Sequence, residues 1–133
     1  MRILVVDDHA DTRALAELAL QDAGYEVRQA TDGADALDVV RAFNPHVVIT
    51  DIFMDTMDGV ELIRTLRRHT PRTKLIAISA GWSRRVSGSR AFDPGGIDVL
   101  EDAITAGADA TMLKPLDTRE LVRTVARLLA EPS

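Results

Sequence analysis

Short runs of Val, Ile and Leu alternate with helical patterns along this chain of 133 residues. Four of these runs lie at residues 3–6, 47–50, 75–78 and 112–113, and residues 25–30 alternate between apolar and polar side chains. Uninterrupted apolar runs are typical of buried parallel strands, and alternation is typical of a strand with one exposed face. The order βαβαβαβαβα therefore predicts an α/β fold, in which helices cover both faces of one doubly wound parallel sheet.

Helical periodicity and helix-ending residues mark the segments between these strands. Gly24 should end the first helix in a left-handed conformation, and Asn44 with Pro45 should end the second. Asp32 can cap the second helix, and Asp117 begins a pattern that resembles a capping box before the last helix. The apolar stripes of the five predicted helices are Leu15, Leu18, Ala19 and Ala23; Ala36, Leu37 and Val40; Val60, Ile63 and Leu66; Ile97, Leu100 and Ile104; and Leu121, Val122, Val125, Leu128 and Leu129.

The segment from Gly81 to Gly96 interrupts this rhythm, because it is rich in Gly, Ser and Arg and shows no periodicity. Loops of this length are uncommon inside a compact domain and are usually either functional or disordered. Its arginines and Trp82 could form a docking patch, or the loop could simply be polar and mobile. We expect one domain over residues 1–133, with residues 81–96 as an extended loop between the fourth strand and fourth helix and with no output domain.

Charged and hydroxyl residues stand at the ends of four predicted strands. Asp7 and Asp8 follow the first strand, Asp51 follows the third, Ser79 the fourth and Lys114 the fifth. In an open α/β sheet the ligand crevice lies at the carboxyl ends of the strands. Folding should therefore bring three carboxylates, one hydroxyl and one ammonium group together at one edge of the sheet.

Composition limits the classes of function. The chain has no Cys, which excludes disulfides, thiolate metal sites and thiol redox chemistry. Its net charge of −5 disfavours direct binding of nucleic acid, which usually requires a basic face. The amino terminus turns acidic too early for a signal peptide, and no apolar stretch approaches the roughly 20 residues of a membrane span. We expect a cytoplasmic protein that does not bind membranes.

The acidic cluster indicates metal-assisted phosphoryl chemistry. Converging carboxylates repel one another, and a divalent cation relieves that repulsion. All-oxygen ligation favours Mg²⁺, with Mn²⁺ as an alternative, over zinc. A hard cation, a lysine and a hydroxyl around one aspartate are what a transferring phosphoryl group requires, and the aspartate itself can be the nucleophile.

Simpler interpretations exist for several of these residues. Asp7 and Asp8 alone could be a helix-capping pair, since Asp suits a helix amino terminus. His9, beside them, is more simply an exposed histidine at the rim of the site than a ligand. A calcium loop that starts at Asp51 is rejected, because Phe53 occupies its third position, which requires an oxygen ligand.

The chain resembles, over essentially its full length, the receiver domain of two-component response regulators. The matching motifs are Asp7-Asp8, residues 51–59, Ser79-Ala80, Gly107-Ala108-Asp109 and Lys114-Pro115. The resemblance implies the flavodoxin-like sheet of chemotaxis-type regulators, with strand order 2-1-3-4-5.

This resemblance also implies roles for the acidic residues. Asp51 would accept a phosphoryl group from a phosphohistidine on a sensor histidine kinase or a histidine phosphotransfer protein. Asp8, Asp51 and the backbone carbonyl of Phe53 would ligate Mg²⁺, and Asp7 would act largely through a metal-bound water. The signal would then pass to a downstream protein target.

The remaining site residues follow from the same resemblance. Lys114 would pair with the phosphoryl oxygens, Ser79 would be a switch hydroxyl that moves toward them, and the bond before Pro115 would be cis. Thr111 stands where the family normally has the aromatic switch residue, so we expect an altered readout. Phe53 cannot orient an attacking water, so we expect slow autodephosphorylation.

Three functions are compared. The first is a phosphorylation-dependent switch, which transfers a phosphoryl group onto itself and is not a multiple-turnover enzyme. The second is a degenerate receiver that acts as a phosphorylation-independent binding module, which Thr111 and the long loop favour. The third is a phosphohydrolase of the haloacid-dehalogenase type, which Phe53 disfavours because those enzymes need an acid at that position. We rank them in this order.

Overall fold

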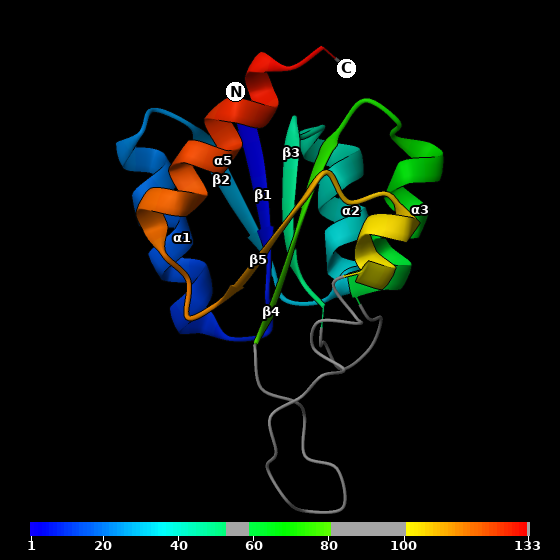
Figure 1. Cartoon of the computed structure of the whole chain (residues 1–133), viewed down its shortest axis with the longest axis horizontal. Coiled ribbons are helices and arrows are strands. Elements are labelled where there is room, and N and C mark those ends of the chain that lie inside the picture. Colours follow the sequence, from blue (N-terminus) through cyan, green and yellow to red (C-terminus); the bar gives the residue numbers. More distant parts are fainter. Residues whose placement is uncertain (53–58, 81–100, 133) are drawn as a thin grey trace, which may run out of the picture.

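A single sheet of five parallel strands forms the centre of the computed structural model (Figure 1). The structure describes residues 1–52, 59–80 and 101–132. The strand order β2-β1-β3-β4-β5 confirms the predicted order 2-1-3-4-5. The strands are β1 (Arg2–Val6), β2 (Glu26–Ala30), β3 (Val47–Asp51), β4 (Lys74–Ala80) and β5 (Ala110–Lys114).

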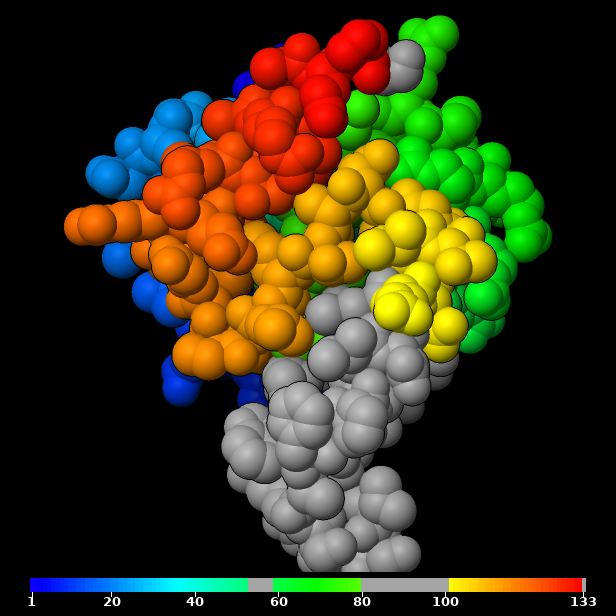
Figure 2. Space-filling model, in the orientation of Figure 1, coloured from blue at the N-terminus to red at the C-terminus, as the bar shows by residue number. Residues whose placement is uncertain are grey.

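Helices cover both faces of this sheet, as the doubly wound pattern predicts. Helices α1 (Ala10–Asp22) and α5 (Thr118–Ala130) lie on one face (Figure 1). Helices α2 (Gly33–Phe43) and α3 (Gly59–His69) lie on the other face, together with the helical residues 101–106. Figure 2 shows the β5 edge of the molecule as solid atoms, with α5 and residues 101–106 on either side of it.

Two apolar clusters, one on each face of the sheet, hold the three layers together. Successive side chains of a strand point to opposite faces, so each strand contributes to both clusters. In β1, Ile3 and Val5 pack in the cluster below α1 and α5, whereas Leu4 and Val6 pack in the cluster below α2 and α3. Because helices cover both faces of the sheet, the strand side chains are buried on both faces. The strand sequences are therefore continuous apolar runs.

The predicted helix ends are present in the structure. The Asp32 carboxylate accepts a hydrogen bond at 2.8 Å from a backbone N–H in the first turn of α2. The Asp117 carboxylate accepts two such bonds at the start of α5, at 2.9 and 3.2 Å. Asn44 ends α2 with a φ of 53°, and Gly24 follows α1 with a φ of 97°, a conformation that Gly adopts without a steric penalty. The helix ends at Gly24 and Asn44 determine where strands β2 and β3 begin.

The buried face of α1 is not the face that its predicted stripe suggested. Ala16 and Leu20 are 1% and 0% exposed, whereas Leu15 and Leu18 are 46% and 68% exposed. The helix itself is confirmed, but Leu15 and Leu18 line a groove of about 720 Å³ between α1 and α5. The buried face carries Ala16 and Leu20, which pack against the strands and α5 in one apolar cluster.

Some predictions fall on parts of the chain that the structure does not describe. Phe53 and the predicted loop at residues 81–96 lie outside the described residues. Of the predicted fourth helix, residues 101–106 are helical, and Gly107 follows with a φ of 127°. Within the described residues, no helix has the length and apolar character needed to cross a bilayer.

Candidate functional site

The carboxyl ends of two neighbouring strands position the acidic residues. Asp7 follows β1 directly, and Asp51 is the last residue of β3. Val6 and Thr50 are register partners in the sheet, so these two strand ends lie side by side. Asp7 and Asp51 are buried at 1% and 4% exposure, whereas Asp8 is exposed. Burial of two carboxylates is costly unless cations or hydrogen-bond donors accompany them.

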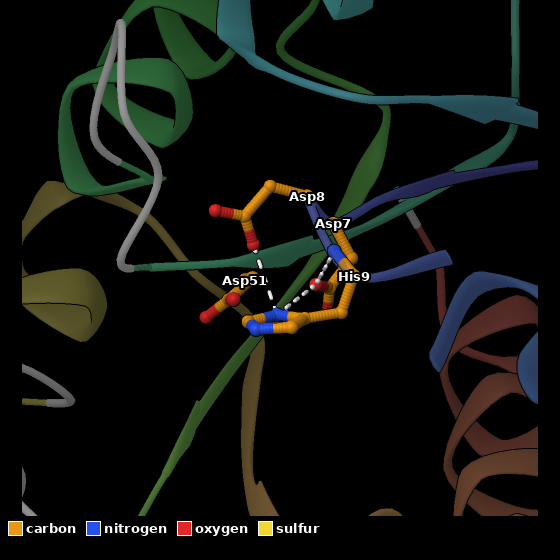
Figure 3. A group of neighbouring side chains, drawn as sticks. All are labelled: Asp7, Asp8, His9 and Asp51. Carbon is orange, nitrogen blue, oxygen red and sulfur yellow. Dashed lines mark hydrogen bonds and ion pairs between the residues drawn. The ribbon is translucent and has the colours of Figure 1, made fainter. Parts of the chain in front are cut away.

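Asp7, Asp8, His9 and Asp51 surround one small space (Figure 3). One ligand atom from each of the four lies within 4.8 Å of the others. The structure thus brings together the three carboxylates that the sequence placed at strand ends. A cluster of carboxylate oxygens of this kind can hold a divalent cation such as Mg²⁺.

Lys114 enters the same site from the end of β5. Its Nζ lies 2.9 Å from Asp7 Oδ2 and 3.2 Å from Asp51 Oδ2. Burial lowers the pKa of Lys114, but the hydrogen bond with Asp7 and the charges of Asp51 and Asp7 outweigh burial and raise that pKa above its usual value. Lys114 is therefore a cation that bridges the two buried carboxylates.

The backbone around Asp7 holds its carboxylate in place. The backbone N–H of His9 donates to Asp7 Oδ1 at 2.8 Å. The backbone of Asp7 is itself fixed, because its N–H donates to the Ala30 carbonyl at 3.2 Å and its carbonyl accepts from Arg13 Nη1 at 2.7 Å. Both carboxylate oxygens of Asp7 are engaged, one by the His9 N–H and one by Lys114. Asp7 is thus held at both ends of its carboxylate by this site's own groups.

Gly59 allows α3 to begin directly against the end of β3. A Cβ atom at this position would lie 2.3 Å from the Asp51 carbonyl oxygen and 2.6 Å from Ile52 Cα. The Gly59 N–H donates to the Ile52 carbonyl at 2.8 Å. Any larger residue would push the helix away from the strand that carries Asp51.

Three of the other predicted site features fall within the described residues. Ser79 is in β4 and is completely buried, and Thr111 is in β5 and half-buried. The peptide bond between Lys114 and Pro115 is cis, as predicted. The carbonyl of Phe53, a predicted metal ligand, lies outside the described residues.

His9 contacts the acidic cluster, which sequence reasoning missed. Its side chain is 69% exposed, as expected for a rim residue. Its Nδ1 nevertheless lies 3.2 Å from Asp7 Oδ1 and 3.0 Å from Asp8 Oδ1. The signal in the sequence was the position of His9 directly after the acidic pair. That position does not determine whether the ring points toward the carboxylates or away from them.

A cleft lies beside the cluster and is lined in part by His9 and Lys114. Its volume is about 450 Å³, and its lining residues are His9, Ala10, Asp11, Thr12 and Lys114. The larger groove between α1 and α5 is lined by apolar side chains together with Asp22, Arg119 and Arg123, and none of the cluster residues lines it. We therefore locate the chemistry at the smaller cleft.

Comparison with known proteins identifies the family. The family model described as the response regulator receiver domain matches residues 3–126. The chain is 34% identical over 128 residues to the transcriptional regulatory protein PrrA of Mycobacterium tuberculosis, covering 96% of this chain and 49% of that protein. It is 33% identical over 131 residues to the response regulator MprA of Mycobacterium avium, covering 97% and 51%. The chain belongs to the response regulator receiver family of two-component systems.

Solved structures agree with this family and its fold. The receiver domain of NtrX from Brucella abortus superposes with a TM-score of 0.83 at 30% identity, covering 98% of this chain and 99% of that one. The chemotaxis protein CheY4 of Vibrio cholerae superposes with a TM-score of 0.79 at 27% identity, covering 96% and 97%. The predicted flavodoxin-like, chemotaxis-regulator-like fold is thereby confirmed.

The chain spans about half the length of the curated relatives just named. It also covers 32% of a protein-glutamate methylesterase of Rhodopseudomonas palustris, at 34% identity over 118 residues. Receivers of this kind thus occur in proteins with different overall activities. Family membership supports a smaller set of properties than the activities of these whole proteins. Response regulators interact with sensor kinases, and receiver domains bind Mg²⁺ at an acidic pocket.

Proposed function

We propose that residues 1–133 form a receiver domain that acts as a phosphoacceptor switch. Asp51 receives a phosphoryl group from a phosphohistidine on a sensor histidine kinase or histidine phosphotransfer protein. The observation that carries this proposal is the position of Lys114 Nζ, 2.9 Å from Asp7 and 3.2 Å from Asp51. An aspartate beside both a fixed cation and a candidate metal site has what phosphoryl transfer requires.

The chemical step uses the Asp51 carboxylate as the nucleophile. One carboxylate oxygen forms a bond to phosphorus while the bond from phosphorus to the histidine nitrogen breaks, and the electron pair of that bond stays on the imidazole. In the transition state the negative charge of the phosphoryl group is spread over its three equatorial oxygens. Lys114 stabilises that charge, because its raised pKa keeps it protonated. The product is an aspartyl phosphate, and the domain is not a multiple-turnover enzyme.

The acidic residues fit a Mg²⁺ ion, with Mn²⁺ as an alternative. Following the receiver family, we assign Asp8, Asp51 and the Phe53 carbonyl as direct ligands. Asp7, whose two carboxylate oxygens have hydrogen-bonded partners, would act through a metal-bound water. When bound, the ion neutralises charge on the phosphoryl oxygens.

The switch is proposed to run through Ser79 to a downstream protein in the cytoplasm. The Ser79 hydroxyl, buried in β4, is one strand away from Asp51 in the sheet. It would donate a hydrogen bond to the phosphoryl group. Thr111 has no ring to report that movement, so the signal leaves by another route. Direct binding of nucleic acid by this domain is not part of the proposal, given the net charge of −5.

The experiment is incubation with a small phosphodonor and Mg²⁺, followed by intact mass. We expect the mass of one acid-labile phosphoryl group on the native protein and none on Asp51→Asn. Asp38→Asn, a change of the same type at a side chain that is 77% exposed on α2, is the matched control and should be modified like the native protein. Omitting Mg²⁺ or adding a chelator should abolish the reaction.

Two results would contradict the proposal. Stoichiometric phosphate on Asp51→Asn would place the acceptor elsewhere. An unmodified native protein, with Mg²⁺ and donor both in excess, would favour the binding-module function instead.

A further inference from the structure

We propose that His9 is an additional ligand, through Nδ1, for the cation in the acidic site, and that it shifts metal preference toward first-row transition ions over Mg²⁺. The inference rests on the metal site of the proposed function but not on phosphoryl transfer. Its test therefore measures metal binding directly.

The distances around the ring nitrogen suit coordination. His9 Nδ1 lies 3.0 Å from Asp8 Oδ1 and 3.2 Å from Asp7 Oδ1. Two ligand atoms that each lie about 2.1 Å from one cation, at right angles, are about 3.0 Å apart. The nitrogen and the Asp8 oxygen are thus already at the spacing of neighbouring ligands in an octahedral site.

One ring nitrogen faces oxygens of two different carboxylates. Nδ1 carries at most one hydrogen, and a single N–H cannot point well at both oxygens. Without an ion, the two distances lie in the ordinary range of N–H···O hydrogen bonds. A cation beside Nδ1 and Asp8 Oδ1 would bind both of these atoms in place of that hydrogen.

The ring has no other assignment in the described structure. His9 is the N-cap residue of α1, yet its side chain makes no capping hydrogen bond. Its backbone is anchored by the bond from its N–H to Asp7 Oδ1 at 2.8 Å. An anchored backbone with a side chain that is 69% exposed lets the ring turn toward an entering ion at little cost.

Nitrogen changes which ions the site prefers. Carboxylates and carbonyls suit Mg²⁺ and Mn²⁺, whereas imidazole suits ions such as Co²⁺, Ni²⁺ and Zn²⁺. Mg²⁺ keeps its waters readily and gains little from replacing one with imidazole. His9 should therefore strengthen Co²⁺ binding much more than Mg²⁺ binding.

The test compares native protein with His9→Ala and with His69→Ala, a matched control at an exposed histidine that ends α3. Pulsed EPR of bound Mn²⁺, on protein labelled with ¹⁵N in its histidines, reports nitrogen in the coordination sphere. We expect nitrogen coupling in native protein and His69→Ala and none in His9→Ala. By calorimetry, His9→Ala should bind Co²⁺ at least about 10-fold more weakly and bind Mg²⁺ almost unchanged.

The outcomes separate this inference from the proposed function. Mn²⁺ that binds native protein without nitrogen coupling would overturn the role of His9 and leave the acidic site intact. Equal or tighter Co²⁺ binding by His9→Ala would also overturn it, because the ring would then compete with the ion. Failure of Mn²⁺ and Mg²⁺ to bind native protein at all would overturn both the role of His9 and the metal site of the proposed function. Loss of Mn²⁺ binding in Asp8→Asn would show that the ion binds at the acidic cluster.

Discussion

The amino and carboxyl ends of the parallel strands balance their charges by different means. At the amino end, cations donate to fixed backbone carbonyls. Arg2 donates to the Asn44 carbonyl from Nε and Nη2 at 3.0 and 2.9 Å, and Lys74 donates to the Pro132 carbonyl at 3.2 Å. Arg67 at the end of α3 donates to the carbonyls of Gly107, Pro71 and Thr73 and pairs with Asp109 at 2.7 Å.

At the carboxyl end, charges face one another. Among the described residues of the cluster, three carboxylates are accompanied by the ammonium of Lys114 and the ring of His9. The ammonium relieves part of the repulsion between the carboxylates, and a bound metal cation would relieve more of it. The charged groups at the amino end stabilise the fold. At the carboxyl end the excess negative charge lowers stability and provides a site where a cation can bind.

The largest effect should come from removing the cation of the carboxyl end. Lys114→Met should lower the free energy of unfolding of the metal-free protein by about 3 kcal/mol, because Asp7 and Asp51 lose their shared partner while buried. Lys74→Met, the same change at the amino end, should cost less than about 0.5 kcal/mol. Urea unfolding in the presence of chelator measures the free energy of unfolding of both variants. Equal losses for Lys114→Met and Lys74→Met would contradict the difference between the two ends of the sheet.

The pH dependence of this difference follows from the raised pKa of Lys114. A cation whose folded pKa is above its unfolded value of about 10.4 stabilises fully at lower pH. The gap between native protein and Lys114→Met should stay constant from about pH 7 to 10 and shrink as pH rises through the raised pKa. A gap that already closes near neutral pH would contradict this.

A smaller loss is expected at the amino end when Arg67 is removed. Arg67→Met should destabilise the protein by about 2 kcal/mol, because the Gly107 carbonyl and the Asp109 carboxylate lose a charged donor. Arg64→Met, at an exposed position of the same helix, should change stability by less than about 0.5 kcal/mol. Thermal unfolding of both variants is the measurement, and Mg²⁺ should not alter the ranking.

The carboxyl end should respond with the opposite sign when a carboxylate is removed. Asp8→Asn should raise the metal-free stability by roughly 0.5–1 kcal/mol, because one of three repelling charges disappears. Saturating Mg²⁺ should stabilise the native protein more than the variant, which has lost a ligand. Unfolding with chelator and with Mg²⁺ gives both values. A variant that is less stable in chelator would show that the cluster is not under repulsion.

The smallest effect should be a pH effect at the amino end. Burial, followed by the nearby charges of Arg2 and the amino terminus, lowers the pKa of His46. The unfolded chain therefore binds the proton more tightly, and stability should fall as pH drops below about 6.5. His46→Asn keeps an acceptor for the Arg2 N–H, which donates to Nδ1 at 2.9 Å, and should flatten that fall. Unfolding midpoints from pH 8 to 5 test this, and identical slopes would contradict it.

Much of the fold was predictable, because its signals are local. Helix ends such as Asp32, Gly24 and Asn44 depend on residues within one turn, and the structure has them where the sequence indicated. The meeting of Asp7 with Asp51 followed from parallel strands that share one carboxyl edge, and the sheet order followed from the resemblance to receiver domains.

Other features depended on contacts between distant segments. Helix α1 carries apolar residues on more than one face, and contacts with the sheet and α5 bury Ala16 and Leu20 while Leu18 stays exposed. The acceptors of Arg67 come from two segments, the nearby residues 71–73 and the distant residues 107–109, and only the folded chain brings the second segment to it. No pattern of residue spacing along the chain predicts that Arg67 will bond to several acceptors.

The sequence by itself determined the alternation of strands and helices, the family and the residues that stand at the strand ends, because periodicity and turn chemistry act over a few neighbouring positions. Only the tertiary structure decided that Lys114 bridges Asp7 as well as Asp51, and that the His9 ring turns toward the carboxylates. Those contacts depend on distances of a few ångströms between side chains, and packing in three dimensions sets such distances.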